Sequence, residues 1–190
     1  MNAVVRDQHI PVPAQDFRAA MRHLAGGVSV VTAGSGSERN GLTATSVSSL
    51  SAEPPTLIVC INRQASAWPL IARHRAFAVN VLASEQIEIG ERFAGKDGVK
   101  GEARFAGADW TTRVTGAPLL KGALAAIDCE LEEAIERHTH LILIGRVLNV
   151  VSSPRSAALA YWQGRYVAID QDDDAVRLAE VSLPTPRALW

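Results

Sequence analysis

The sequence predicts a single, mainly antiparallel β domain with helices packed outside it. Short apolar runs rich in Val, Ile, Leu and Thr recur along the chain, each bounded by Gly, Pro, Asn or charged residues, which is typical of strands joined by turns. Segments with helical spacing are fewer and shorter. The 190 residues match the size of one ordinary domain, and no internal repeat or low-complexity linker divides them.

The strands are expected where β-branched and other apolar residues cluster. The first follows Gly26-Gly27, and the run of Leu, Ile and Val at 141–151 is the strongest strand signal in the chain. The segment 34–41 has the composition of a hairpin turn that ends in the pair Asn40-Gly41. The expected strands are 28–32, 56–62, 76–82, 123–136, 141–151 and 165–169.

Helical spacing of apolar residues predicts short helices between these strands. Phe17, Met21 and Leu24 give the first of them one apolar face. Ser153-Pro154 indicates the start of a helix that continues through Trp162. The expected helices are 15–24, 66–74, 85–94 and 153–162, and residues 95–107, rich in Gly and charge, are expected to form a loop.

The ends of the chain differ in composition from its centre. We expect residues 1–15 to form an N-terminal extension, 16–170 the folded domain and 171–190 a C-terminal tail. The tail is acidic at first and then carries two prolines, which predicts either an extended arm or disorder.

Composition excludes several classes of partner. Lys and Arg together number 19 against 20 Asp and Glu, so no basic surface for nucleic acid is indicated. There is no signal-type segment and no uncharged apolar run near the roughly 18 residues that a membrane span needs, so a cytoplasmic protein without a membrane segment is expected. Cys60 and Cys129 lie in separate apolar runs, which favours core residues over a disulfide or a zinc site.

The sequence lacks the complete motifs of common nucleotide-binding proteins and hydrolases. The spacing from Gly90 to Lys96 resembles a phosphate-binding loop, but Asp97 stands where a magnesium-binding hydroxyl is required. The glycines around Ser35 lack the third glycine of a dinucleotide fingerprint. The Ser-x-x-Lys and Gly-x-Ser-x-Gly patterns are absent.

Two clusters carry candidate chemistry. Five hydroxyl side chains between residues 43 and 49 offer hydrogen-bond donors beside small Ala44, although a solvated loop has the same composition. His138 and His140 lie two apart at the start of a predicted strand, which places both on one face. Because no third ligand lies nearby, an imidazole that contacts substrate is favoured over a metal site, and an exposed or hydrogen-bonded histidine remains the alternative.

Several motifs taken in order resemble the flavin reductase-like domain family. They are FR at 17–18, LAGGVSVVT at 24–32, GLTATSVSSLS at 41–51, PP at 54–55, LIVCIN at 57–62, FAVNVL at 77–82, ERFA at 91–94, IGRV at 144–147 and GRY at 164–166. The resemblance covers about residues 16 to 170. It implies a Greek-key split β-barrel of the FMN-binding type, assembled as a homodimer with each flavin near the subunit interface.

The resemblance also implies an activity and a set of site residues. The chain would be an NAD(P)H-dependent flavin reductase of the 4-hydroxyphenylacetate 3-monooxygenase reductase type, which reduces FMN or FAD with NADH or NADPH and passes reduced flavin to a partner monooxygenase. His140 would contact the nicotinamide. The flavin-binding positions would be Thr43, Ala44, Thr45, Ser46, Ser48 and Ser49 for ring and phosphate, Cys60, Ile61 and Asn62 along the ring, Ser66 near the phosphate, Phe93 in the helix that closes the site, and Arg165 with Tyr166 near the nicotinamide pocket.

One departure and two alternatives accompany this interpretation. Many relatives have a Gly-Asp pair before the histidine, whereas this chain has His138-Thr139, which affects nicotinamide binding and the choice between NADH and NADPH. Hydride transfer needs only that the two rings stack, so His140 is expected to orient the nicotinamide rather than transfer a proton. The alternatives are an electron-transfer flavoprotein with permanently bound FMN and an FMN-dependent corrinoid reductase.

Overall fold

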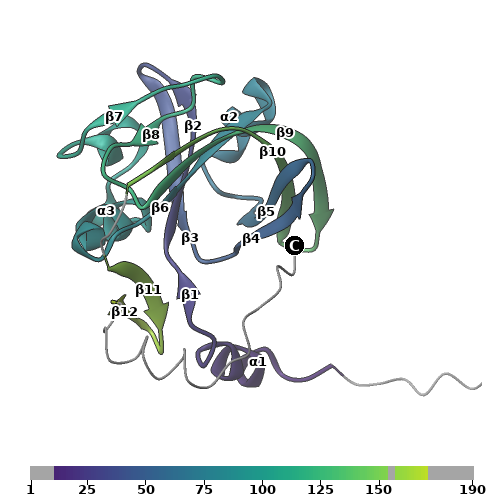
Figure 1. Cartoon of the computed structure of the whole chain (residues 1–190). Helices are drawn as coiled ribbons and strands as arrows, with labels where there is room; N and C mark the ends of the chain where they lie inside the picture. The colour runs from purple at the N-terminus through teal and green to yellow at the C-terminus, as the bar shows by residue number, and fades with distance from the viewer. Residues whose placement is uncertain (1–10, 154–156, 171–190) are drawn as a thin grey trace, which may run out of the picture.

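One antiparallel sheet of seven strands forms the body of the protein (Figure 1). The computed structural model describes residues 11–153 and 157–170. The strands are β2 (Ser29–Ser35), β3 (Glu38–Ala44), β4 (Val47–Ala52), β5 (Pro55–Asn62), β6 (Ala76–Val81), β9 (Ala125–Arg137) and β10 (His140–Ser152). Their order in the sheet is β3-β2-β6-β9-β10-β5-β4. The predicted mainly β fold is confirmed.

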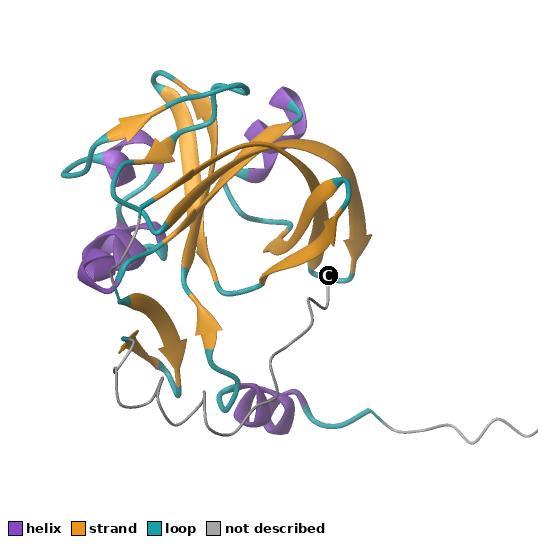
Figure 2. Cartoon of the chain, in the orientation of Figure 1, coloured by secondary structure: helices purple, strands orange, loops and turns teal. Residues whose placement is uncertain are grey.

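The sheet curls until its two edge strands, β3 and β4, approach each other (Figure 2). Only Thr45 and Ser46 separate the end of β3 from the start of β4. Because so short a connection spans at most about 11 Å, the opposite edges of the sheet must meet at this end. The result is a barrel that is split between β3 and β4, as the resemblance implied.

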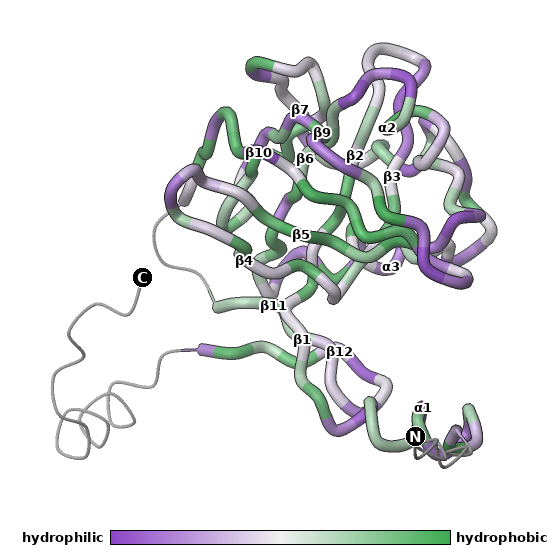
Figure 3. Tube along the Cα trace, turned by 90° about the vertical axis from the view of Figure 1, so that its right-hand side faces the viewer, coloured by the Kyte–Doolittle hydropathy of each residue, from purple (hydrophilic) through white to green (hydrophobic). Residues whose placement is uncertain are grey.

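Alternation along the strands produces two apolar layers. Val31 and Phe77 belong to a buried cluster that draws on β2, β3, β5, β6, β9 and β10 and therefore fills the barrel interior, with Ile71 of α2 (Trp68–His74) packed against it. Val30 and Ala78, one residue away in the same strands, belong to a second cluster on the outer face. In Figure 3, β5 crosses the barrel as a continuous hydrophobic segment.

The outer cluster is covered by short elements. These are η1 (Ser84–Gln86), α3 (Ile87–Phe93), η2 (Lys96–Gly98), η3 (Gly101–Phe105) and the small sheet of β7 (Trp110–Thr111) with β8 (Leu119–Leu120). Asn80 fixes the segment at β8 from inside the protein. Its side-chain amide donates to the carbonyls of Val30 and Pro118, and its side-chain oxygen accepts from the Leu120 N–H. Buried polar groups satisfied in this way hold a loop in one place.

A separate three-stranded sheet lies below the barrel. It consists of β1 (Gly26–Gly27), β11 (Ala158–Trp162) and β12 (Arg165–Ile169), with α1 (Ala14–Met21) beside it (Figure 1). No residue of α1 is buried. Of the helices in the described ranges, none is both long and apolar enough to span a bilayer.

Two sequence predictions of secondary structure are wrong. The expected helix at 153–162 is a strand from Ala158 onward, and residues 154–156 lie outside the described part of the chain. A short apolar run does not distinguish the two states by itself, and here pairing with both β12 and β1 decides for the strand. The Asn40-Gly41 pair lies inside β3, because the turn forms earlier, between Ser35 and Glu38.

The other expected elements are present with small shifts of their ends. The predicted helix at 85–94 begins with the 3-10 turn η1, and part of the predicted loop at 95–107 forms the short turns η2 and η3. The hydroxyl-rich segment is mostly strand, since it spans the end of β3 and the start of β4. The predicted tail at 171–190 and residues 1–10 of the extension lie outside the described residues.

Candidate functional site

The candidate site lies where β4 begins and β5 continues beyond it. Val47 pairs with Val59, so the β4 ladder starts there, whereas β5 extends to Asn62. The Ser46 hydroxyl donates a hydrogen bond to the Cys60 carbonyl, with the two oxygens 2.7 Å apart. Ser46 and Asn62 are exposed and Cys60 is half-buried. This end of β5 therefore presents an accessible strand edge beside small hydroxyl side chains.

His140 joins the same place from the neighbouring strand. It is the first residue of β10 and pairs directly with Asn62 of β5. Its imidazole is exposed, and its Nδ1 atom lies 2.8 Å from the Thr139 hydroxyl. The fold thus brings together Ser46, Cys60, Asn62 and His140, which are widely separated in the sequence.

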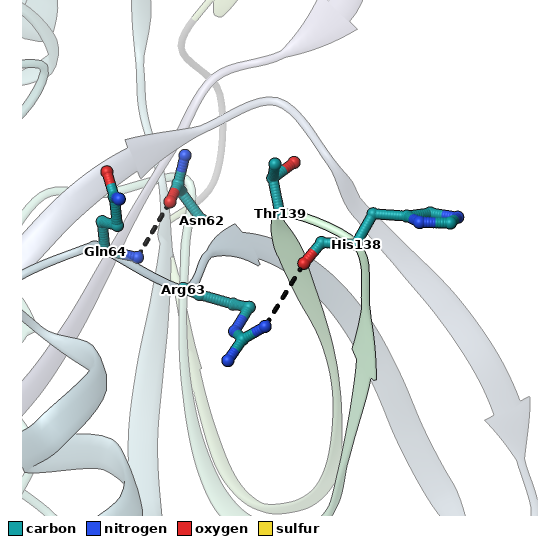
Figure 4. A pocket seen from close by; sticks show the side chains of 5 residues that line it. All are labelled: Asn62, Arg63, Gln64, His138 and Thr139. Carbon is teal, nitrogen blue, oxygen red and sulfur yellow. Dashed lines mark hydrogen bonds between the residues drawn. The ribbon is translucent and has the colours of Figure 1, made fainter.

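A pocket of about 430 Å³ opens beside this edge (Figure 4). It is lined by Asn62, Arg63 and Gln64 from the segment after β5 and by His138 and Thr139 from the loop between β9 and β10. The Asn62 side-chain oxygen accepts a hydrogen bond from the Gln64 N–H at 2.8 Å, which shapes the turn. The Arg63 N–H donates to the Thr139 carbonyl at 3.0 Å, so the two loops that line the pocket are held together.

Arg63 provides a cation at this pocket. Its guanidinium donates to the His138 carbonyl at 3.4 Å and lies 3.4 Å from a carboxylate oxygen of Glu136. Both side chains are about half exposed or more, at 49% and 63%, so this ion pair holds the guanidinium only weakly. Ser66, exposed and three residues further on, adds a hydroxyl. The segment 62–66 therefore contains the donors that a phosphate group requires.

His138 does not share a face with His140, contrary to the sequence prediction. It lies in the two-residue loop between β9 and β10, where its φ is +50°. Figure 4 shows its ring pointing away from Asn62 and Thr139. Glycine is favoured at such a position, so a histidine there carries a conformational cost.

A second group of predicted residues meets at α3. The Thr43 hydroxyl donates to the Gly90 carbonyl at 2.6 Å. The Tyr166 hydroxyl lies near the same glycine, because a Cβ built on Gly90 would be 3.7 Å from it. Burial, reinforced by Glu91 and then Tyr161, raises the pKa of Tyr166, so its phenol stays protonated and able to donate at neutral pH.

Phe93 occupies a packing position. Its side chain is 1% exposed and contacts the rings of Phe105 and Trp110, with centroids 5.0 and 5.6 Å away. Gly41 leaves room for this ring, because a Cβ there would lie 2.7 Å from it. The predicted contact of Phe93 with a flavin stays a prediction, and what the structure shows is that the ring fixes α3 against β3.

The remaining predicted residues differ in what they can offer. Ala44 and Ile61 have buried side chains in the barrel interior, so only their backbone groups can face a ligand. Ser48 and Ser49 are exposed on β4, opposite Ile58 and Leu57, further from the Asn62 end. Arg165 is exposed at the start of β12. Thr45 lines a different cleft, beside α1.

The donors at the end of β5 fit a flavin better than a metal ion. A strand edge with hydroxyls and small side chains allows a flat polar ring to approach closely, and Arg63 with Ser66 can receive a phosphate. Across residues 11–153 and 157–170, no three His, Cys, Asp or Glu side chains gather as metal ligands would.

Sequence inspection missed Arg63 and Thr139 as site residues. A cation directly after the predicted Asn62 was a usable signal for Arg63. Thr139 carried no such signal, because its importance depends on the hydrogen bonds at the tip of the β9–β10 hairpin.

Known proteins share this fold and sequence. The flavin reductase like domain family matches residues 21–170. The FMN reductase (NADH) RutF of Stutzerimonas stutzeri (strain A1501) is 43% identical over 156 residues, which cover 82% of this chain and 88% of that protein. The protein of the same name from Klebsiella pneumoniae (strain 342) is 40% identical, over 78% of this chain and 89% of its own length.

Solved structures agree with this assignment. BorF, the flavin reductase component of a bacterial two-component tryptophan halogenase, superposes with a TM-score of 0.77 at 31% identity, over 84% of this chain and all of that one. The NADH:FAD oxidoreductase SgcE6 of Streptomyces globisporus C-1027 gives 0.75 at 29% identity, over 87% of this chain and all of that one. The sequence motifs, the split barrel and these matches agree, and the chain belongs to the flavin reductase like domain family.

Proposed function

We propose that this protein is an NADH-dependent FMN reductase that supplies reduced flavin to a partner monooxygenase. The observation that carries the proposal is the meeting of Ser46, Cys60, Asn62 and His140 at the open end of β5, in a chain 43% identical to an FMN reductase (NADH). The catalytic unit spans residues 16–170.

Each part of the site has a role in this proposal. When bound, the isoalloxazine ring supplies the redox chemistry, because it accepts a hydride from the nicotinamide. The backbone of Cys60, Ile61 and Asn62 would bind that ring, and the hydroxyls of Thr45 and Ser46 would donate to its polar atoms. Arg63 and Ser66 hold the phosphate. His140 orients the nicotinamide by a hydrogen bond, which is a contribution to alignment rather than to proton transfer.

A homodimer completes the site in this proposal. Helix α1 buries no residue, and Phe17, Met21 and Leu24 are 57%, 44% and 66% exposed. They line a cleft of about 570 Å³ that also contains Thr45, one of the proposed flavin ligands. An apolar helix face beside a ligand-binding residue is a surface that a second subunit would cover.

The proposed partner and compartment are supported by related proteins and by the state of the cysteines. BorF serves a two-component halogenase, and another structure of this fold is nitrilotriacetate monooxygenase component B. The accessible end of β5 supports release of reduced flavin to such a partner. Both cysteines are free, which supports a reducing compartment, and we assign the protein to the cytoplasm.

Steady-state oxidation of NADH and NADPH, with and without added FMN, FAD or riboflavin, tests the function. We expect turnover that depends on added FMN and prefers NADH, with most flavin passing a filter that retains the protein. Tightly retained flavin without NADH oxidation would contradict the proposal and favour an electron-transfer flavoprotein. If neither NADH nor NADPH is oxidised even when flavin is added, the proposal is contradicted as well.

A further inference from the structure

The hairpin that carries His140 holds its imidazole through the preceding residue. Thr139 Oγ1 lies 2.8 Å from His140 Nδ1. Both side chains are exposed, so the contact is formed at the accessible end of the strand. A ring nitrogen at this distance from a hydroxyl is hydrogen-bonded to it.

The backbone of Thr139 is itself fixed. Its carbonyl accepts the Arg63 N–H at 3.0 Å, and the loop of two residues is closed by the pair between Arg137 and His140. In Figure 4 the Thr139 side chain stands beside Asn62, the residue that pairs with His140 in the sheet. The backbone that carries the hydroxyl is therefore held by both loops that line the 430 Å³ pocket.

A hydrogen bond at Nδ1 determines what the other nitrogen can do. In a neutral imidazole one nitrogen carries the proton and the other accepts. If the Thr139 hydroxyl donates to Nδ1, the proton of His140 resides on Nε2. That atom is the ring nitrogen further from the backbone, and it can then donate to a carbonyl oxygen of a ligand.

We propose that Thr139 is a positioning residue that fixes His140 as the Nε2–H tautomer and aims this donor at the carboxamide oxygen of the bound nicotinamide. The proposal rests on the proposed function for the identity of the ligand.

The test compares Thr139→Val, Thr139→Ser and a matched surface control, Thr112→Val. Imidazole ¹⁵N NMR identifies the tautomer of His140, with its signal among the five histidines assigned by its loss in His140→Gln. We expect Nε2–H in the wild type, in Thr139→Ser and in Thr112→Val, and a mixture of tautomers in Thr139→Val. The same spectra show whether each variant is folded.

Transient reduction of FMN by NADH gives the second readout. We expect Thr139→Val to slow reduction about fivefold, the effect of losing one hydrogen bond, with the KM for FMN within about twofold of wild type and with rescue by Thr139→Ser. An unchanged tautomer in Thr139→Val, or a serine variant as slow as valine, would overturn the proposal. If the wild type itself reduces no flavin, the proposed function fails, and the NMR comparison alone then decides whether Thr139 sets the tautomer.

Discussion

The hydroxyl of Ser46 donates to the carbonyl of Cys60 beside the split of the barrel, with 2.7 Å between the oxygens. This bond ties the two-residue link between β3 and β4 to the exposed end of β5. It therefore holds two proposed flavin-binding residues, one in this link and one on β5, in a fixed relation.

Ser46→Ala should weaken flavin binding. The variant loses both the tie to Cys60 and a hydroxyl at the edge of the proposed flavin site, which together correspond to about 1–2 kcal/mol, or a rise in the KM for FMN of roughly five- to thirtyfold. Ser37→Ala, in the exposed β2–β3 turn, is the matched control. Equal KM values for the two variants in steady-state assays would contradict this role for Ser46.

Arg63→Gln should discriminate between flavins. If the guanidinium holds the phosphate, its loss raises the KM for FMN at least about tenfold, since charge-assisted hydrogen bonds are the stronger kind, and leaves the KM for riboflavin, which has no phosphate, nearly unchanged. Arg73→Gln is the control, because Arg73 is also exposed and pairs with Glu38 at 3.4 Å. A parallel loss for both flavins would show that Arg63 acts through the fold of the loop.

His138→Gly should stabilise the protein. A residue with a side chain at φ of +50° carries a conformational cost of about 1–2 kcal/mol that glycine avoids, partly offset by the greater freedom of glycine in the unfolded chain. A net gain of about 1 kcal/mol should raise the midpoint of thermal unfolding by about 2–4 °C. His138→Ala retains the strain and should show no such rise, and a decrease in the glycine variant would argue that the His138 side chain makes a stabilising contact.

Stability should fall at alkaline pH because of Cys129. Burial, followed by the charge of Asp128, raises the pKa of this thiol from 9.0 to about 12. The folded state keeps the proton that the unfolded state loses above about pH 9, so the contribution of the thiol is complete below that pH and declines as pH rises toward about 12, by at most about 1.4 kcal/mol per pH unit. Denaturant unfolding of Cys129→Ala should show a shallower decline than wild type. Val79→Ala, a buried control on β6 that removes no titrating group, should keep the wild-type slope.

Charge placed on the apolar face of α1 should separate the subunits. Phe17→Glu combined with Met21→Glu puts two carboxylates into the cleft that contains Thr45, and light scattering at micromolar concentration should then give the monomer mass. NADH-dependent FMN reduction should fall at the same time, because the second subunit completes the site. Ala20→Glu, on the same helix but outside the cleft, should remain dimeric. A monomeric wild type would refute the proposed dimer directly.

The sequence by itself determined the long strands of the barrel and the family. Long apolar runs such as 141–151 predicted β10, because β-branched and aliphatic residues at that density favour a buried strand, and the ordered motifs between 16 and 170 led to the split barrel and the flavin chemistry. The apolar runs and the motifs can be recognised in the sequence without knowing which segments pack against one another.

Only the tertiary structure decided the elements and contacts that depend on pairing. Residues 158–162 were expected to continue a helix that starts at Ser153-Pro154 but form β11, since strands on both sides supply hydrogen bonds that outweigh this local signal. The turn at 36–37 displaced the Asn40-Gly41 pair into a strand, and the two-residue loop at 138–139 separated His138 from His140. The meeting of Arg63, Thr139 and His140 likewise arises from strand register, in which one pairing of β5 with β10 brings distant residues to the same edge.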